Sequence, residues 1–453
     1  MSSISLVDKL DENLFSDKIF KKFYNFYVFW FVLMPFVETG FHCVGLTFDL
    51  ILQPMIISAL FVLTKIFELI FNFKKISLKN KTIIDFLFFC LFIWFFISSS
   101  VSKAFNVKFF YGLSLFGCFY LFMNINKQYY AKIGLIFVLE MVFDSLLGII
   151  DLNNCIIPGF NSECFAMSMQ FLNPNWSGFV ILIAEIICLW FIFKVNKNWQ
   201  KTTLFTGFIV MTVGLFIGGS FAPETSLFLC ELALIIYLWV KNKKCPLWIL
   251  CAFLTTVLIS FIVWLVPIWR IKSTAQANYF YETIAVIDNI LNTNLLESIS
   301  TFFNRIFGWD IVKFVAGSDG WDRSGLTREA LIYIFATPKS FIFGYGAGYL
   351  YKIRVHNCFL ALWLEFGFVS LLIYLTIIAF IVVRFIKIKK TDETVCLFAL
   401  FLTMLFESLF CCIEPYNFIF FVMFSAVFYK KLYDSELKIK KESKEKLNKT
   451  AKE

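Results

Sequence analysis

The sequence predicts an all-α, polytopic membrane protein with about 12 transmembrane helices. Of its 453 residues, 60% are hydrophobic and only 16% are charged, whereas an ordinary soluble domain carries roughly 25% charged residues. Runs of about 20 apolar residues recur along the chain, and this is the length that an α-helix needs to cross the hydrocarbon core of a bilayer. The composition therefore excludes a disordered chain and a soluble enzyme of ordinary composition.

Twelve windows of the sequence have the length and the apolar content of a spanning helix. The close pairs at 203–240 and 394–433 also fit re-entrant segments. In chain order, the windows are 23–44, 48–71, 82–101, 107–124, 133–151, 176–194, 203–221, 223–240, 246–269, 358–385, 394–412 and 416–433.

Lysine and arginine in the short connections predict the orientation of these helices, because cytoplasmic loops carry an excess of both. The connections on one side of the membrane hold 16 such residues, and the alternate short connections hold only Lys103 and Lys108. Residues 1–22 and the charged tail 434–453 fall on the positive side, so both termini are expected in the cytoplasm. The net charge of +9 follows from this topology and from attraction to anionic lipid, and no nucleic-acid partner is expected.

One connection, residues 270–357, is much longer than the others and holds 88 residues. It lies on the outer side, between the ninth and tenth predicted helices, and loops of this length usually have a function. We expect short helices within it. The chain therefore divides into a cytoplasmic segment 1–22, nine helices in 23–269, the extracytoplasmic loop 270–357, three helices in 358–433 and a cytoplasmic tail 434–453.

Arginine is concentrated in this outer loop. Five of the six Arg lie in it, whereas the other 35 basic residues of the chain are all Lys. A guanidinium group binds phosphate and carboxylate groups through two parallel hydrogen bonds, which an ammonium group does not. We therefore expect an anionic ligand here; the alternative is that these arginines form ion pairs with acidic residues of the same loop. The five are Arg270, Arg305, Arg323, Arg328 and Arg354.

The chain has two histidines, His42 near the outer end of the first helix and His356 at the end of the long loop. His356 lies two residues after Arg354 and next to Asn357, at the predicted boundary between water and membrane. An unshifted imidazole titrates near pH 6.5, so it can accept a proton from a hydroxyl nucleophile at neutral pH. A packing or capping role for His356 is the alternative.

The His356-Asn357 pair is followed after nine residues by Gly367. This pattern resembles the signature of the O-antigen ligase and O-antigen polymerase superfamily of bacterial integral-membrane proteins. In the family's pattern a second Gly follows, and Ser370 stands at that position here. The departure weakens what the pattern implies about helix packing, but the match at His356 is unaffected.

The sequence upstream of this pair is similar to the same family. Arg323 opens a segment with the pattern of an amphipathic helix, which also carries Arg328, and Pro338 follows it. The run Gly344-Tyr-Gly346-Ala-Gly predicts a tight turn that returns the loop to the membrane. Together with the long outer loop, these residues match the family's order of arginine, helix, proline and Gly-x-Gly.

The resemblance implies the reaction. It is transfer of a glycan from an undecaprenyl-diphosphate-linked donor at the outer face of the bacterial cytoplasmic membrane, with inversion of the anomeric centre. His356 would deprotonate the acceptor hydroxyl, and arginine side chains would stabilise the diphosphate leaving group. Arg270 and Arg323 are the first choices for this diphosphate site, and Arg328 and Arg354 are the second. No metal and no cofactor are expected.

The acceptor separates two versions of this function. A polymerase, which we favour, would join repeat units into O-antigen, capsular polysaccharide or exopolysaccharide, whereas a ligase would transfer the glycan to lipid A core or another acceptor. The implied partners are the lipid-linked donor, the glycan or lipid A core acceptor, membrane lipids, a flippase and a chain-length regulator. A flippase or transporter of lipid-linked oligosaccharides is the alternative from another class, because such proteins also have about 12 helices and buried carboxylates.

Polar residues inside the predicted helices suggest a substrate cavity. Glu140 and Asp144 lie four residues apart on one helix face, and ionisable groups in a membrane usually face a cavity or a partner. A proton relay, or carboxyls that hold helices together, are the alternatives. We assign Asn357 and Asn175 to the same cavity, the latter because Asn173-Pro-Asn-Trp176 is also similar to the family. Whether Cys155 and Cys164, which share an outer loop, form a disulfide is left open.

Overall fold

The computed structural model describes ten helices with defined bounds, and no strand occurs among the residues that it describes. Two of these helices, α15 and α16, are the short helices expected within the loop 270–357. The described residues are 83–104, 127–151, 174–218, 221–242, 247–265, 323–346, 355, 357–388 and 392–410, with Lys22, Phe23, Phe26, Tyr27, Leu60, Leu63 and Thr64. The helices are α4 (Ile83–Val101), α6 (Lys127–Asp151), α7 (Pro174–Lys194), α8 (Asn198–Gly218), α9 (Phe221–Asn242), α10 (Leu247–Leu265), α15 (Arg323–Phe335), α16 (Pro338–Phe343), α17 (Cys358–Lys387) and α18 (Asp392–Phe410).

Eight of these helices coincide with windows that the apolar pattern predicts. The starts of two differ: α6 begins at Lys127 and α8 at Asn198, so Lys127, Lys132 and Lys201 lie in helices and not in connections. A positive residue at a helix end can extend along the helix surface to water, so an apolar count places such ends too late. The windows 23–44, 48–71, 107–124 and 416–433 fall mostly or wholly outside the described residues.

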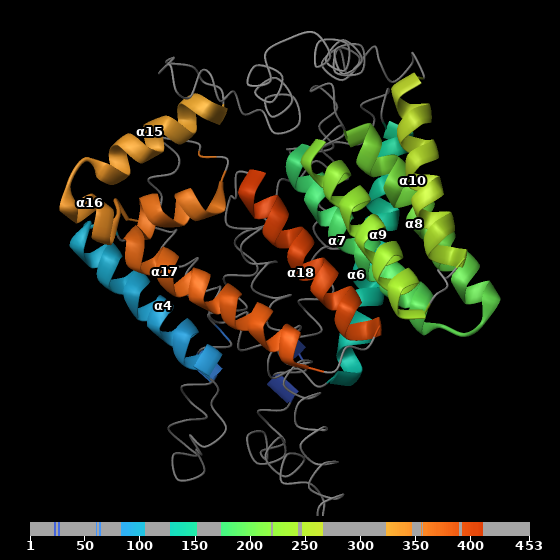
Figure 1. The fold of residues 1–453 in the computed structure, drawn as a ribbon, viewed down its shortest axis with the longest axis horizontal. Helices are drawn as coiled ribbons and strands as arrows, with labels where there is room; N and C mark the ends of the chain where they lie inside the picture. The colour runs from blue at the N-terminus through green and yellow to red at the C-terminus, as the bar shows by residue number, and fades with distance from the viewer. Residues whose placement is uncertain are drawn as a thin grey trace, which may run out of the picture.

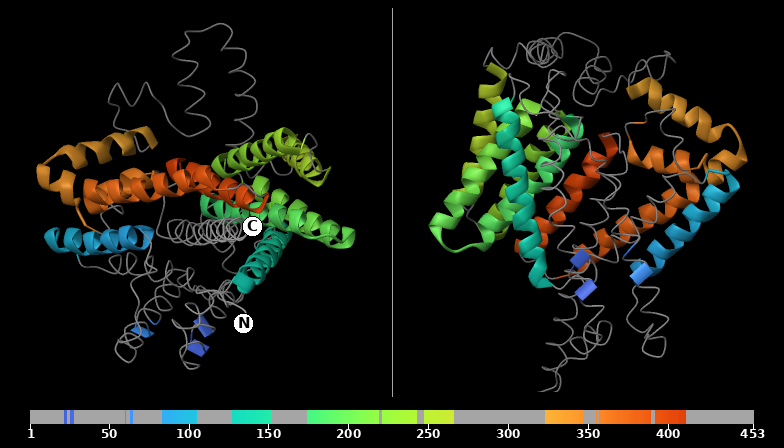
Figure 2. Two further views of the ribbon diagram at one scale, coloured as in Figure 1. Left: turned by 60° about the horizontal axis from the view of Figure 1, so that its bottom comes forward. Right: turned by 180° about the vertical axis from the view of Figure 1, so that it is seen from behind.

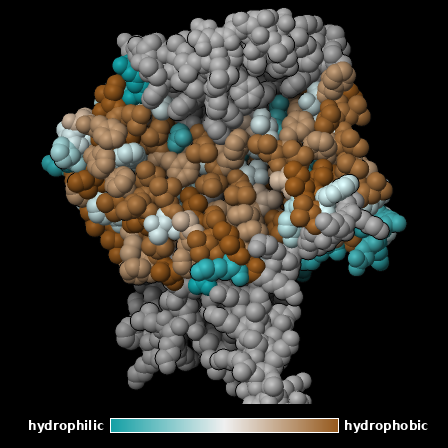
Figure 3. Space-filling model, viewed as in Figure 1, coloured by the Kyte–Doolittle hydropathy of each residue, from teal (hydrophilic) through white to brown (hydrophobic). Residues whose placement is uncertain are grey.

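The described helices have the dimensions and the surface of a membrane protein. Four of them, α7, α8, α9 and α17, are long and apolar enough to cross a membrane, and α4, α10 and α18 contain shorter apolar stretches. Large apolar side chains are also exposed along the outer sides of several helices, and Figure 3 shows a broad hydrophobic face. Because soluble monomers rarely expose apolar patches of this extent, the chain is an α-helical membrane protein.

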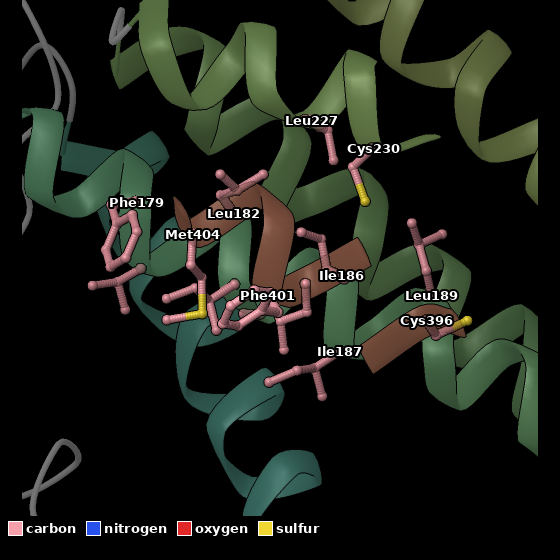
Figure 4. Close-up of a cluster of buried hydrophobic side chains, with 14 of the residues drawn as sticks. Phe179, Leu182, Ile186, Ile187, Leu189, Leu227, Cys230, Cys396, Phe401 and Met404 are labelled. Carbon is pink, nitrogen blue, oxygen red and sulfur yellow. The ribbon is translucent and has the colours of Figure 1, made fainter. Parts of the chain in front are cut away.

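Helix α7 is the centre of one group of helices. Its sequence is apolar on nearly every side, which is typical of a helix with neighbours all round, and every residue from Ser177 to Leu189 is buried. It packs against α6, α8, α9 and α18. Figure 4 shows the resulting cluster, with Leu182 and Ile186 from α7, Leu227 and Cys230 from α9, and Phe401 and Met404 from α18.

Helix α17 is the centre of a second group. Helix α4 runs beside it, and α15 and α16 pack over one end of it (Figures 1 and 2). Helix α18 contacts α17 and also α7 and α9, so it joins the two groups. The end of α17 that α15 and α16 cover is its N-terminal end, directly after the His356-Asn357 pair.

Candidate functional site at the start of α17

Asn357 begins α17 as its N-cap. Its backbone is extended (φ −154°, ψ 119°), and its side-chain Oδ1 accepts a hydrogen bond from the backbone N–H of Leu360, 3.0 Å away. Such a cap satisfies one of the four N–H groups that the first turn of a helix leaves without an intrahelical partner. The side-chain Nδ2 of Asn357 donates to the carbonyl oxygen of Leu409, 3.1 Å away, near the end of α18. One amide therefore fixes the start of α17 relative to the end of α18.

Helix α15 is attached to the same segment by a small hydrophobic cluster. Ala330 and Ile334 of α15 are fully buried against residues just before and just after Asn357. Arg328, one turn before Ile332, is half-buried on this helix. The cluster consists of Ala330, Ile334, Val355, Ala361 and Leu364. The arginine-bearing helix and the start of α17 thus form one packed unit.

A tight corner connects α15 to α16. Thr337 caps α16 in a reciprocal arrangement: its side chain accepts from the N–H of Ser340, and the Ser340 side chain accepts from the N–H of Thr337, each at 3.0 Å. Pro338 follows at the first helical position, where no N–H is needed. The Tyr345 hydroxyl then donates to the carbonyl of Tyr333, 2.9 Å away, and closes the corner. Pro338 thus takes the first helical position of α16, directly after the cap.

Helix α17 is broken at Gly367. The apolar window 358–385 predicts one straight spanning helix, but Gly367 adopts φ 80° and ψ 175°, far from helical values. The first segment, residues 358–366, is therefore a separate short helix between Asn357 and the break. The nine-residue spacing from Asn357 to Gly367 corresponds to this short helix.

The break releases carbonyl groups that other segments then satisfy, as buried backbone acceptors require. The backbone N–H groups of Tyr345 and Gly346 donate to the carbonyls of Leu364 (2.9 Å) and Glu365 (2.8 Å). Trp94 of α4 donates its indole N–H to the carbonyl of Phe366, 2.8 Å away. The loop after α16 and one side chain of α4 thus replace the missing helical bonds.

Ser370 contributes to the same break. Its hydroxyl contacts the carbonyl oxygens of Gly367, 2.7 Å away, and Leu362, 3.3 Å away. This is the position at which the chain departs from the second Gly of the family's pattern. The serine side chain therefore supplies a donor directly beside the broken turn.

Gly344 and Gly346 also contact the broken part of α17, and the chain bends between them. Gly344 and Gly346 have positive φ values of 71° and 88°, which residues with a side chain adopt only at a cost. A β-carbon on Gly344 would lie 2.5 Å from the carbonyl oxygen of Glu365, and one on Gly346 would overlap Ala104. The turn is tight because it lies between α4 and the broken part of α17.

Trp94 and Ser98 of α4, and Ser102 just after this helix, complete the contact between α16 and the break in α17, and sequence reasoning did not identify them. Ser98 donates to the carbonyl of Phe343, Ser102 donates to that of Gly344 at 3.2 Å, and the Trp94 ring stacks on Phe343 at 5.4 Å. A signal was present in the sequence, because Ser98-Ser-Ser100 stand at the end of an otherwise apolar window and Ser102 directly follows it. Hydroxyl groups clustered at a helix end are typical of contacts with backbone carbonyls.

The remaining predicted site residues differ in what the structure describes of them. Glu140 and Asp144 are fully buried on α6, which packs against α7 and α8, and they therefore belong to the other helix group. Arg323 and Asn175 lie in the first turns of α15 and α7, where only the backbone is described. His356, Arg270 and Arg354 lie outside the described residues, as do Arg305, His42, Cys155 and Cys164.

Other buried carboxylates link helices of the first group. Glu407 of α18 accepts a hydrogen bond from the Ser226 hydroxyl of α9, and Glu231 of α9 accepts one from Thr256 of α10 at 3.1 Å. Within the described part of the chain, no three His, Cys, Asp or Glu side chains lie close enough together to hold a metal ion. The hydrogen bonds of Glu231 and Glu407 agree with the alternative in which intramembrane carboxyls hold helices together.

The sequence matches no protein-family model and no curated protein.

Proposed function

We propose that the protein is an inverting glycosyltransferase of the membrane that joins undecaprenyl-diphosphate-linked repeat units into a polysaccharide. In this proposal the chain has about 12 spans and both termini in the cytoplasm, and α15, α16 and the start of α17 lie at the outer face of a bacterial cytoplasmic membrane. The reaction takes place where the His356-Asn357 pair enters the membrane.

One observation carries the proposal. Helix α15, with Arg328 in its second turn, packs directly on the short helix that Asn357 caps. The residue before this cap is His356. A base for the acceptor and a cation for the leaving group must act on one glycosidic centre, so they must be held by one rigid part of the protein. The packing of α15 on residues 358–366 supports such an arrangement.

The proposed chemistry uses Arg328 of this unit and residues that flank the unit in the sequence. His356 takes the proton from the acceptor hydroxyl as the new bond to the anomeric carbon forms, a contribution of roughly 10²–10⁴-fold. The bond to the diphosphate breaks on the opposite face, which inverts the anomeric centre. Arginine side chains stabilise the negative charge that develops on the diphosphate, Arg323 and Arg328 from α15 and Arg270 and Arg354 from the adjoining loop.

The test is a comparison of matched variants in nanodiscs. Purified protein is incubated with an undecaprenyl-diphosphate-linked repeat unit, and product length is read on a gel. We expect no chain growth with His356→Ala or Arg328→Ala, and normal growth with His42→Ala and Arg384→Ala, which remove the other histidine and the arginine at the far end of α17. Full-length glycan from the His356→Ala variant would refute the proposal.

The same assay separates a polymerase from a ligase. With the donor alone, a polymerase makes longer lipid-linked chains. A ligase transfers the glycan to lipid A core when this acceptor is added. Without the acceptor, a ligase makes no longer lipid-linked chains.

A flippase is the second candidate, and the buried carboxylates favour it. Glu140, Asp144, Glu185, Glu231 and Glu407 are all fully buried in the helix group around α7, and carboxylates inside a membrane are costly and often functional. Movement of a fluorescent lipid-linked oligosaccharide between leaflets, abolished by Glu185→Gln and with no chain growth, would support this function. The hydrogen bonds of Glu231 and Glu407 to neighbouring helices favour the structural interpretation for these two residues.

A further inference from the structure

Four aromatic rings meet where α15, α16 and the break in α17 come together. Phe341 and Trp363 form the centre, with their ring centroids 5.2 Å apart. The ring of Phe335 lies 5.5 Å from each of them, and the ring of Phe368 lies 5.2 Å from Phe341 and 5.4 Å from Trp363. We call this cluster the aromatic corner. The indole N–H of Trp363 donates to the carbonyl of Phe341, 3.1 Å away, so the corner presents no unpaired indole donor to its surroundings.

The outward side of the aromatic corner is exposed. Phe335 is 61% exposed, Ile332 57%, Ile342 40% and Phe368 37%. The opposite side of α15 is fully buried at Ala330 and Ile334. The C-terminal half of α15 is therefore apolar on both sides, whereas a helix at a water-facing surface is usually polar on its outer side.

This exposed patch continues onto helices that belong to the membrane. On α17, which is long and apolar enough to span, Phe368 is followed by exposed Leu372 and Leu375. Helix α16 packs on both α17 and α4, and the outer side of α4 is apolar as well, with Phe86, Phe89, Ile93 and Phe96 exposed. The exposed apolar side chains of α4 and α17 therefore lie on the helices that pack against the aromatic corner, and they extend its apolar surface.

The polarity of α15 changes along its length. Its second turn carries Arg328, half-buried, and Glu329, exposed, whereas the exposed residues of its later turns are Ile332 and Phe335. Lys339 of α16 is the next exposed charged residue, and a lysine stem is long enough to carry its ammonium group to the headgroups. The change from charged to apolar falls between Glu329 and Ile332.

We propose that the C-terminal half of α15, together with α16 and Phe368, is inserted among the acyl chains of the bilayer. The leaflet is the one in which α17 begins. The extended apolar surface and the change of polarity along α15 support this proposal. The occupant of the exposed aromatic corner is bilayer lipid. Helix α15 crosses obliquely from the headgroups, at Glu329, into the hydrocarbon region, at Ile332. Arg328 lies four residues before Ile332, which is about 6 Å along the axis of the helix. In this proposal Arg328 is therefore at the depth of the lipid phosphate groups. This inference does not depend on the proposed reaction.

Spin labels can measure this depth directly. The chain has 13 cysteines, so the label is attached to p-acetylphenylalanine that replaces Ile332, Phe335, Ile342, Glu329 or Leu372, one at a time, in nanodiscs of phosphatidylethanolamine and phosphatidylglycerol. Accessibility to oxygen, which concentrates in lipid, is compared with accessibility to a water-soluble nickel chelate. Leu372 on α17 is the lipid reference, and Glu329 is the water reference.

We expect oxygen accessibility to exceed nickel accessibility at Ile332, Phe335 and Ile342, to the same extent as at Leu372, and the reverse at Glu329. Nickel accessibility at Phe335 equal to that at Glu329 would overturn the inference, because the corner would then be in water. Low accessibility to both reagents at Phe335, with dimers on size exclusion, would also overturn it in favour of a second copy of the chain.

The melting temperature of a Phe335 variant gives an independent test, because water and lipid around this side chain predict destabilisation of different size. Phe335→Asp places a charge at a side chain that is mostly exposed. In water, the cost of this change is limited to the lost ring contacts with Phe341 and Trp363, whereas among acyl chains the cost of a charge in lipid is added to it. We expect Phe335→Asp to lower the apparent melting temperature in nanodiscs and Phe335→Leu to leave it nearly unchanged; equal melting of both variants would contradict the lipid contact.

Discussion

The carbonyl oxygen of Ile342, in α16, occupies the space that a β-carbon on Gly367 would need. The two residues are 25 positions apart in the sequence, and their contact joins the outer helix pair to the break in α17. Backbone hydrogen bonds from Tyr345 and Gly346 to Leu364 and Glu365 surround this contact. The Gly-x-Gly turn and the glycine after the His-Asn pair, which are separate in the sequence pattern, are therefore two sides of one joint.

We predict that Gly367→Ala is strongly destabilising. The substitution requires a positive φ for a residue with a side chain, and its β-carbon overlaps the backbone of Ile342, for a total cost of about 3 kcal/mol or more. The apparent melting temperature of detergent-solubilised protein measures this. Gly134→Ala is the control, because its β-carbon would meet only side-chain atoms, the nearest 3.3 Å away. If the two variants melted together, the contact between α16 and α17 would not be as close as described.

The loss of one indole hydrogen bond should also be measurable. Trp94→Phe keeps an aromatic ring for stacking on Phe343 but leaves the carbonyl of Phe366 without its donor, at a cost of about 1–3 kcal/mol. Trp199→Phe, at a position that is 65% exposed, should change the melting temperature very little. An equal effect of both substitutions would mean that the Trp94 bond does not stabilise the break.

Two substitutions of Asn357 should separate its two hydrogen bonds. Asn357→Asp keeps the oxygen that accepts from Leu360 but loses the donor to Leu409, whereas Asn357→Ala loses both. Because an N-cap contributes about 1 kcal/mol, we expect melting temperatures in the order wild type, Asn357→Asp, Asn357→Ala. Indistinguishable variants would argue against the cap.

The proposed diphosphate site makes a prediction about charge and shape. Arg328→Lys keeps the positive charge but loses the planar pair of donors, so we expect the rate of chain growth to fall on the order of 10²-fold. Arg384→Lys, at the other end of α17 where the guanidinium lies 5.0 Å from the Phe380 ring, should retain full activity. Unchanged growth with Arg328→Lys would remove this arginine from the site.

The apolar pattern of the sequence predicts where helices lie better than how they are interrupted. Windows of about 20 apolar residues correspond to eight described helices because burial in lipid depends mainly on local composition. The break at Gly367 depends on Ile342, Tyr345 and Trp94, which are distant in sequence, and periodicity within 358–385 contains no information about them. The resemblance placed glycines at these positions without indicating that they touch each other.

The candidate site shows the same division. Residue type and spacing predict the arginines and the His-Asn pair as candidates, because a planar cation and an imidazole have few substitutes in phosphate binding and proton transfer. The partners of Ser98 and Ser102 could not be predicted, because a hydroxyl in or beside an apolar window has many uses, and the carbonyls of Phe343 and Gly344 that these serines contact are 245 and 242 positions away in the sequence.

The short helix between Asn357 and Gly367 fixes a rotation as well as a length. Each residue of an α-helix advances about 1.5 Å and turns by about 100°, so an insertion within residues 358–366 would swing the capped end round the helix axis while the joint at Gly367 stayed in place. The direction in which the chain enters the helix would then change by the same rotation. Length variation is for this reason far less tolerable in these nine positions than in the loop that precedes them.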